Sequence, residues 1–136
     1  MQGEGQLIID HFKLQKSSSP IDDICPCVLY SGEYEGTKLS LVLNGKSKDY
    51  GVDEVGTVPA ALSTYIAVTK LKPDLIINAG TAGGFEAKGG AIGDVYISTR
   101  IANHDRRIPI PDYIPYARST YECLPTPQLL KVTDVT

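Results

Sequence analysis

The sequence lacks the features of membrane, secreted and nucleic-acid-binding proteins. None of its apolar runs approaches the ~20 residues that a membrane-spanning helix requires. Its first residues include Glu4 and Asp10 and have no basic region, unlike a secretory signal. The net charge is −3, and no basic stripe is present. We therefore expect no membrane and no nucleic-acid partner.

Cysteine is scarce, and its count of three is odd. An odd count does not suit a disulfide framework, so we expect a reducing compartment and a cytoplasmic location. Cys25 and Cys27 flank a proline and offer half of a metal site, but Cys123 alone does not supply a second pair. The pattern favours buried or idle thiols, and we expect neither a metal nor a cofactor.

What remains is the composition of an ordinary globular chain, with 136 residues, 42% of them hydrophobic. One domain is the default expectation at this length. Apolar spacing predicts helices over residues 2–15 and 55–72, the second ended by Pro73. The apolar face expected for that second helix consists of Val58, Ala61, Leu62, Tyr65, Ile66 and Thr69.

Strand patterns occur between and after these helices. Residues 27–34 and 38–45 predict a hairpin around a turn at 35–37. Residues 74–80 are apolar without alternation, which is typical of a central strand covered on both faces. We further expect a strand over 94–102, an ordered proline-rich loop, and a short helix over 127–135. The element order predicts an α/β sandwich with a mixed sheet.

A glycine-rich loop, residues 78–84 (NAGTAGG), follows the predicted central strand. Ligands of open α/β sheets bind beyond the carboxyl ends of such strands. The glycines permit positive φ angles and close backbone approach, and Thr81 adds a hydroxyl group. The loop matches neither the P-loop nor the dinucleotide-binding motif. From the residues alone, a tight structural turn and a ligand-binding loop remain equally open.

Two further polar features carry weaker signals. His104 and Asp105 follow the end of a predicted strand and offer an acid–base pair, although an ion cluster at a surface or interface is the favoured interpretation. Glu4 lies between two glycines near the N-terminus, where a carboxylate taken by itself is a solvated surface group.

Taken together, two stretches resemble the 5′-methylthioadenosine/S-adenosylhomocysteine nucleosidases, in particular the plant type. They are residues 53–97, from DEVGTVPAAL to GDVYI, and residues 103–111, NHDRRIPIP. The N-terminal MQGEG is similar to the family's Met-Gln-Ala-Glu-Ala segment, with glycines in place of alanines. The match is strongest over residues 53–111, and over residues 5–50 only the hairpin fits well.

The resemblance implies a mixed-sheet, three-layer, nucleoside phosphorylase-like α/β fold. Residues 1–136 would then form a partial nucleosidase domain that holds only the N-terminal half of this fold. The family's first buried strand would precede Met1. Its distal half would follow Thr136, with the Met-Glu motif that holds the ribose and the aspartate that protonates the purine. We therefore expect a chain truncated at both ends.

The resemblance also implies a site and a reaction. Glu4 falls on the general base that takes a proton from the attacking water, and Thr81 falls beside that water and the ribose. The backbone of Ala79, Gly80 and Gly83 would line the ribose side. Water would attack the anomeric carbon of 5′-methylthioadenosine and yield adenine and methylthioribose, a step of methionine salvage. S-adenosylhomocysteine is a second candidate substrate.

The family resemblance implies a homodimer as well. Ile108, Pro109, Ile110 and Pro111 fall where one subunit covers the 5′-thioalkyl group bound in its partner. Two alternatives remain open. One is a catalytically impaired paralogue that binds a purine nucleoside or pairs with a full-length subunit. The other is a nucleoside phosphorylase, in which Lys46 and Lys48 would face phosphate.

Overall fold

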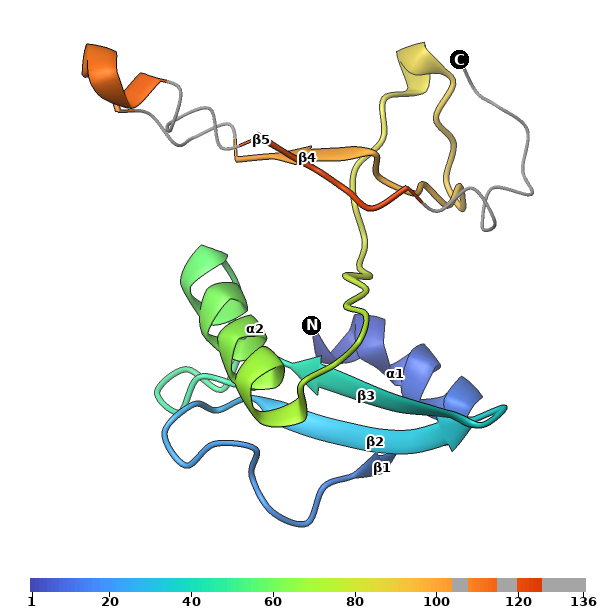
Figure 1. The fold of residues 1–136 in the computed structure, drawn as a ribbon. Coiled ribbons are helices and arrows are strands. Elements are labelled where there is room, and N and C mark those ends of the chain that lie inside the picture. Colours follow the sequence, from blue (N-terminus) through green and yellow to red (C-terminus); the bar gives the residue numbers. More distant parts are fainter. Residues whose placement is uncertain (104–107, 115–119, 126–136) are drawn as a thin grey trace. The chain divides into compact units, whose positions relative to one another are not determined.

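The computed structural model describes residues 1–103, 108–114 and 120–125. The chain divides into two compact units, Met1–Gly83 and Gly84–Thr136 (Figure 1). The predicted helix over 127–135 and the His104–Asp105 pair lie outside the described residues. None of the helices described here is long and apolar enough to cross a membrane.

The first unit is built on the predicted hairpin, which the structure confirms. Strand β2 (Val28–Tyr34) pairs antiparallel with β3 (Thr37–Leu43), and β1 (Gln15–Lys16) adds to the other edge of β2. Glu35 and Gly36 join β2 to β3, and both have positive φ, 49° and 77°. A two-residue turn of this kind matches the twist of the strands and therefore fixes the register of the hairpin.

Helix α1 (Gln2–Phe12) packs against β2 and β3 (Figure 1). Its Ile9 forms the buried core with Leu14 and Leu43. The helix approaches the hairpin closely at Gly5, where an added Cβ would lie 2.9 Å from a methyl group of Leu43. The helix ends earlier than the predicted residue 15, because Lys13 adopts the left-handed conformation (φ 52°, ψ 40°) that terminates helices.

Helix α2 (Thr57–Leu71) agrees closely with its predicted bounds, but of the predicted apolar face only Ile66 is buried. Ser63 and Ile66 are its buried residues, whereas Val58, Leu62 and Tyr65 are 67%, 52% and 70% exposed. A polar contact accounts for the rotation. The Ser63 hydroxyl donates to Oδ1 of Asn44 at 2.7 Å, which turns the serine side of the helix toward the end of β3.

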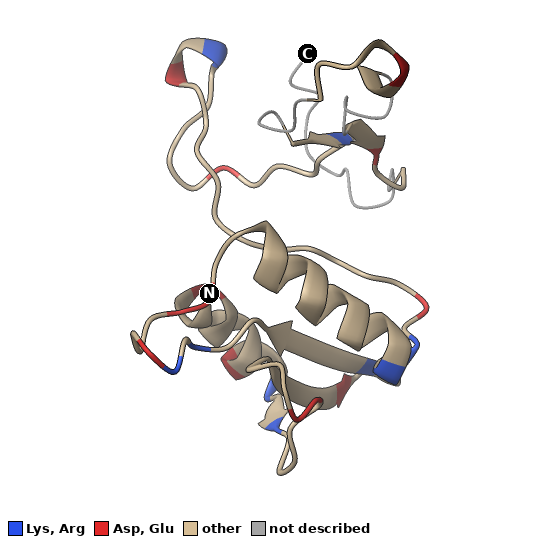
Figure 2. Cartoon of the chain, turned by 90° about the vertical axis from the view of Figure 1, so that its left-hand side faces the viewer, with Lys and Arg blue, Asp and Glu red and all other residues tan. Residues whose placement is uncertain are grey.

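The predicted central strand over residues 74–80 is also wrong. The segment has no regular secondary structure and continues from the end of α2 as an unpaired trace (Figure 1). Leu75, Ile76 and Ile77 are 57%, 55% and 75% exposed. A strand requires a hydrogen-bonded neighbour, and no described residue takes that position here. Beyond Asp74 the trace carries no charge until Glu86 (Figure 2).

The second unit contains two short turns and a small ribbon. The turns are the 3₁₀ segments η1 (Glu86–Lys88) and η2 (Pro111–Tyr113), and the ribbon pairs β4 (Arg100–Ala102) with β5 (Thr120–Glu122). Only the last three residues of the predicted strand 94–102 are a strand. Asp94 explains the late start, because its carboxylate accepts from the Ala91 amide and the Tyr96 hydroxyl and so holds a turn.

Candidate active site around Glu4 and Thr81

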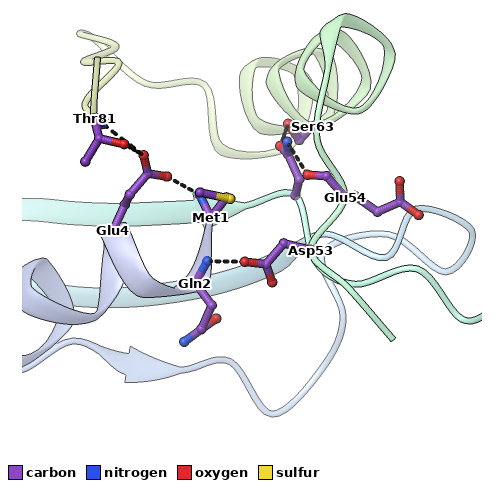
Figure 3. Close-up of polar contacts among 8 residues, drawn as sticks. Met1, Gln2, Glu4, Asp53, Glu54, Ser63 and Thr81 are labelled. Atoms are coloured by element: carbon purple, nitrogen blue, oxygen red, sulfur yellow. Dashed lines mark hydrogen bonds and ion pairs between the residues drawn. The ribbon is translucent and has the colours of Figure 1, made fainter. Parts of the chain in front are cut away.

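Glu4 and Thr81, 77 residues apart in the sequence, meet within the first unit (Figure 3). Glu4 lies in the first turn of α1. Its Oε1 accepts two hydrogen bonds from Thr81, one from the backbone amide at 2.8 Å and one from the hydroxyl at 2.7 Å. Its Oε2 accepts from the Met1 ammonium group at 2.5 Å. The structure thus brings together the two residues that the sequence analysis singled out.

These donors set the charge of Glu4. They lower its pKa from the usual 4.5 to about 2, with the hydrogen bond from the Met1 ammonium as the largest cause and the two bonds from Thr81 next. Hydrogen bonds to a carboxylate favour its charged form. Glu4 is therefore ionised at neutral pH, which is the state that a general base requires. The same contacts weaken its basicity, because both oxygens already accept hydrogen bonds.

The glycine-rich loop places its backbone against this carboxylate. A Cβ added at Gly80 would lie 3.4 Å from Oε1 of Glu4, so the backbone passes at contact distance. Gly80, Gly83 and Gly84 are not among the residues with positive φ. The positive φ angles that glycine permits are therefore not used at these three positions. The 3.4 Å distance at Gly80 is an ordinary van der Waals contact, and a Cβ at Gly83 would meet nothing within 4 Å, so space alone requires glycine at neither position.

Ala79 completes the predicted ribose wall and is exposed, as are Gly80, Thr81 and Gly83. The Glu4 side chain itself is 22% exposed. The predicted 5′-pocket residues belong to the second unit, where Ile108 is half-buried and Pro109, Ile110 and Pro111 are exposed. Their role remains a prediction.

A second group of polar residues, which the sequence analysis missed, holds the start of α1 (Figure 3). The carboxylate of Asp53 accepts from the Gln2 amide at 3.0 Å. Asn44 donates its side-chain amide to the Glu54 carbonyl at 3.1 Å and accepts from Ser63. An acidic group at a helix N-terminus satisfies a free amide and the helix dipole. Asp53 thereby orients the first turn of α1, which carries Glu4. The sequence analysis missed this contact because Asp53 lies 51 residues from Gln2, so no local pattern marks it.

A cavity of about 210 Å³ lies beside this group, lined in part by Gln2, Lys16, Lys46 and Asp53. Neither Glu4 nor Thr81 lines it. Sites for small molecules usually have volumes of roughly 300–1,000 Å³. Within the part of the chain that the structure describes, this cavity is therefore smaller than a typical nucleoside site.

The three thiols are free. Burial, followed by a hydrogen bond with Cys25, raises the pKa of the Cys27 thiol to about 12. A thiol that stays protonated is a poor nucleophile and a poor metal ligand. This supports the idle-thiol interpretation for Cys27. Among the described residues, no group of three or more His, Cys, Asp and Glu is arranged to hold a metal ion.

Comparison with known proteins extends the resemblance beyond residues 53–111. The family model described as the phosphorylase superfamily matches residues 1–134. The chain is 43% identical to the 5′-methylthioadenosine/S-adenosylhomocysteine nucleosidase of Arabidopsis thaliana over 132 residues, 96% of this chain and 52% of that protein. It is 36% identical to a nucleosidase of the same name from Bacillus subtilis (strain 168), over 81% of this chain and 42% of the relative.

Solved structures agree with these matches. A crystal structure of an MTA/SAH nucleosidase and a structure of Arabidopsis thaliana 5′-methylthioadenosine nucleosidase in apo form each superpose with a TM-score of 0.91 at 43% identity. Each match covers 96% of this chain and 54% of the other chain. The predicted α/β, nucleoside phosphorylase-like fold class is thus confirmed. The chain spans about half the length of the curated relatives it matches, and it belongs to the phosphorylase superfamily.

Proposed function

We propose that this chain carries the general-base side of a nucleosidase site and serves the hydrolysis of 5′-methylthioadenosine to adenine and methylthioribose. The observation that carries the proposal is the contact between Glu4 and both the amide and the hydroxyl of Thr81. It joins an ionised carboxylate to the glycine-rich loop where a ligand is expected. The 43% identity to the Arabidopsis thaliana nucleosidases supports the choice of substrate.

In this mechanism water forms a bond to the anomeric carbon while the bond from that carbon to the purine nitrogen breaks. The proton of the water passes to Glu4, and the leaving adenine takes up a proton from a separate acid. The sugar becomes cationic and oxocarbenium-like in the transition state, so the negative charge of Glu4 also stabilises it. The attacking water donates to Oε2, which has acceptor capacity left beside the Met1 ammonium, because an ionised carboxylate offers about four acceptor sites.

The Thr81 contacts hold Glu4 in one orientation during this step. A positioned general base contributes roughly 10²–10⁴-fold to the rate. A carboxylate at the start of a helix has several rotamers, and two hydrogen bonds to one oxygen restrict them. We assign Thr81 as the residue that positions the base and Glu4 as the base itself.

The finer parts of the proposal follow the same resemblance. Residues 1–136 form part of one nucleosidase domain, the protein acts in methionine salvage in the cytoplasm, and it forms a homodimer. The loop Ile108–Pro109–Ile110–Pro111 covers the 5′-thioalkyl group in the partner subunit. S-adenosylhomocysteine is the second substrate to assay, since the nucleosidases of similar sequence from Arabidopsis thaliana and Bacillus subtilis carry it in their names.

The test measures adenine release from 5′-methylthioadenosine. Reactions run with and without phosphate are compared by chromatography of their products. We expect release that exceeds that of Glu4→Gln and that yields free methylthioribose without phosphate. Glu54→Gln is the matched control, because the hydrogen bonds given for Glu54 use its backbone amide and carbonyl, which the substitution keeps. Release that requires phosphate would instead favour the phosphorylase alternative. Equal release by the chain and Glu4→Gln would overturn the role of Glu4.

A further inference from the structure

The loop that joins β1 to β2, residues 17–27, carries two of the three thiols of the chain (Figure 1). Cys25 and Cys27 flank Pro26 at the end of this loop, just before β2 begins. Cys25 is half-buried, whereas Cys27 is 4% exposed. A hydrogen bond joins the two side chains. Their contact makes possible a reaction between two sulfur atoms that a single thiol does not offer.

Local structure restrains the backbone around this pair. The carboxylate of Asp22 accepts hydrogen bonds from the amides of Ile24 and Cys25, at 3.0 and 2.9 Å, which forms a turn before the proline. Proline fixes its own φ angle and restricts the residue that precedes it. The Pro26 carbonyl packs against Gly45, where an added Cβ would lie 1.8 Å from the carbonyl oxygen. The fold therefore holds the two sulfur atoms near one another.

A cavity of about 340 Å³ gives small solutes access to the pair, because both Cys25 and Cys27 line it. Hydrogen peroxide is only slightly larger than water, so a cavity of this volume admits it. A metal suits the pair less well. Among the described residues, no group of three or more His, Cys, Asp and Glu is placed to bind one. Oxidation is therefore the chemistry that fits this pair.

We propose that Cys25 and Cys27 form a dithiol site that hydrogen peroxide oxidises to an intramolecular disulfide. The Cys25 thiolate attacks one peroxide oxygen, the O–O bond breaks, and a sulfenic acid and hydroxide form. The Cys27 sulfur then bonds to the Cys25 sulfur as the S–OH bond breaks, and the Cys27 proton leaves with the hydroxyl group as water. In sum, two thiols and one peroxide give one disulfide and two waters.

The different surroundings of the two thiols fit these separate roles. Cys25 is the more exposed sulfur and meets the oxidant first. Burial, followed by the hydrogen bond with Cys25, raises the pKa of the Cys27 thiol to about 12, so Cys27 is idle toward the oxidant and keeps the proton that the second step uses. Neither step involves Glu4, so the proposal is independent of the proposed hydrolysis.

The test treats the full chain with hydrogen peroxide at neutral pH, unfolds it, alkylates the remaining thiols and digests it with trypsin for mass spectrometry. Cys25 and Cys27 fall in one tryptic peptide, residues 17–38, and Cys123 falls in another, residues 119–131. We expect peptide 17–38 to lose both alkylation sites and both thiol hydrogens, and to regain them after reduction. Cys123 should stay alkylated. It is the matched control, because it is half-buried like Cys25 but belongs to the second unit.

Two substitutions separate the two steps. In Cys27→Ser the resolving thiol is missing, so we expect a sulfenic acid at Cys25 that dimedone labels at least about tenfold more than in the unmodified chain. In Cys25→Ser we expect no disulfide, with Cys27 still open to alkylation after unfolding. Far-UV circular dichroism checks that both variants keep the fold of the unmodified chain.

Three results would overturn the proposal. The first is peptide 17–38 with both cysteines still alkylated after peroxide treatment. The second is irreversible oxidation of Cys25 to a sulfinic or sulfonic acid while Cys27 stays open to alkylation. The third is oxidation of Cys123 as fast as that of the pair, which would show that contact between Cys25 and Cys27 gives them no special reactivity.

Discussion

At the scale of single residues, the chemistry of this chain centres on Glu4. Its side chain accepts three hydrogen bonds, two of them from a residue 77 positions away. A glutamate in the first turn of a helix is ordinarily explained by capping and by the helix dipole. Neither explanation requires Thr81. The contact between Glu4 and Thr81 is therefore the feature that distinguishes a site from a cap.

This contact predicts a shift in titration. Thr81→Val removes the hydroxyl donor, so we expect the pKa of Glu4 to rise from about 2 toward 4.5. Acetylation of the Met1 amine removes the largest cause and should raise the pKa further. Carboxyl NMR over a pH series measures both effects. Thr69→Val is the control, since that hydroxyl bonds to carbonyls of α2. An unchanged pKa of Glu4 in Thr81→Val would contradict the contact.

The sign of the linked stability effect follows from the lowered pKa. A carboxyl group whose pKa is lowered in the folded state contributes stability above its unfolded pKa and loses it as the pH falls through the folded pKa. We therefore expect the contribution of Glu4 to be complete above about pH 4.5 and to vanish toward about pH 2. The free energies of unfolding of the chain and of Thr81→Val, measured in urea across this pH range, should converge at its acid end.

At the scale of elements, local sequence patterns were sufficient to predict that the two helices and the hairpin form. The turn residues Glu35 and Gly36 lie within the hairpin they form, so the sequence identifies them directly. The rotation of α2 was missed because it depends on the bond between Ser63 and Asn44, 19 residues apart. Residues 74–80 were predicted to lie in a sheet because their apolar composition is typical of a buried strand, but composition does not identify a strand partner.

The loop between β3 and α2 offers a test of close packing. A Cβ added at Gly45, where φ is +87°, would lie 1.8 Å from the Pro26 carbonyl oxygen. Gly36 also has positive φ, +77°, but a Cβ there would meet nothing. We expect Gly36→Ala to lower the free energy of unfolding by about 1–2 kcal/mol and Gly45→Ala by about 3 kcal/mol or more. Equal losses in urea unfolding would show that Gly45 does not contact Pro26.

At the scale of the whole molecule, the chain holds one side of a site and a small core. Five hydrophobic residues in the described parts are buried: Ile9, Leu14, Cys27, Leu43 and Ile66. Many more large apolar side chains are exposed, including those of Leu75, Ile76 and Ile77. The chain spans about half the length of the curated relatives it matches.

The site was predictable from sequence only through the family resemblance. From composition alone, Glu4 was interpreted as a solvated surface residue. The glycine-rich loop could be either a structural turn or a ligand site. The structure adds the geometry that joins Glu4 to Thr81 and the Asp53 contact that holds the first turn of α1. These contacts link residues far apart in the sequence, and no local spacing encodes them.

The most direct test of the account is the rate of adenine release from 5′-methylthioadenosine at pH 7. It should be measured for the chain and for Glu4→Gln under the same conditions. The account predicts that Glu4→Gln lowers the rate by about 10²–10⁴-fold wherever the unmodified chain is active. Equal rates for the two chains, or no release by either, would contradict it.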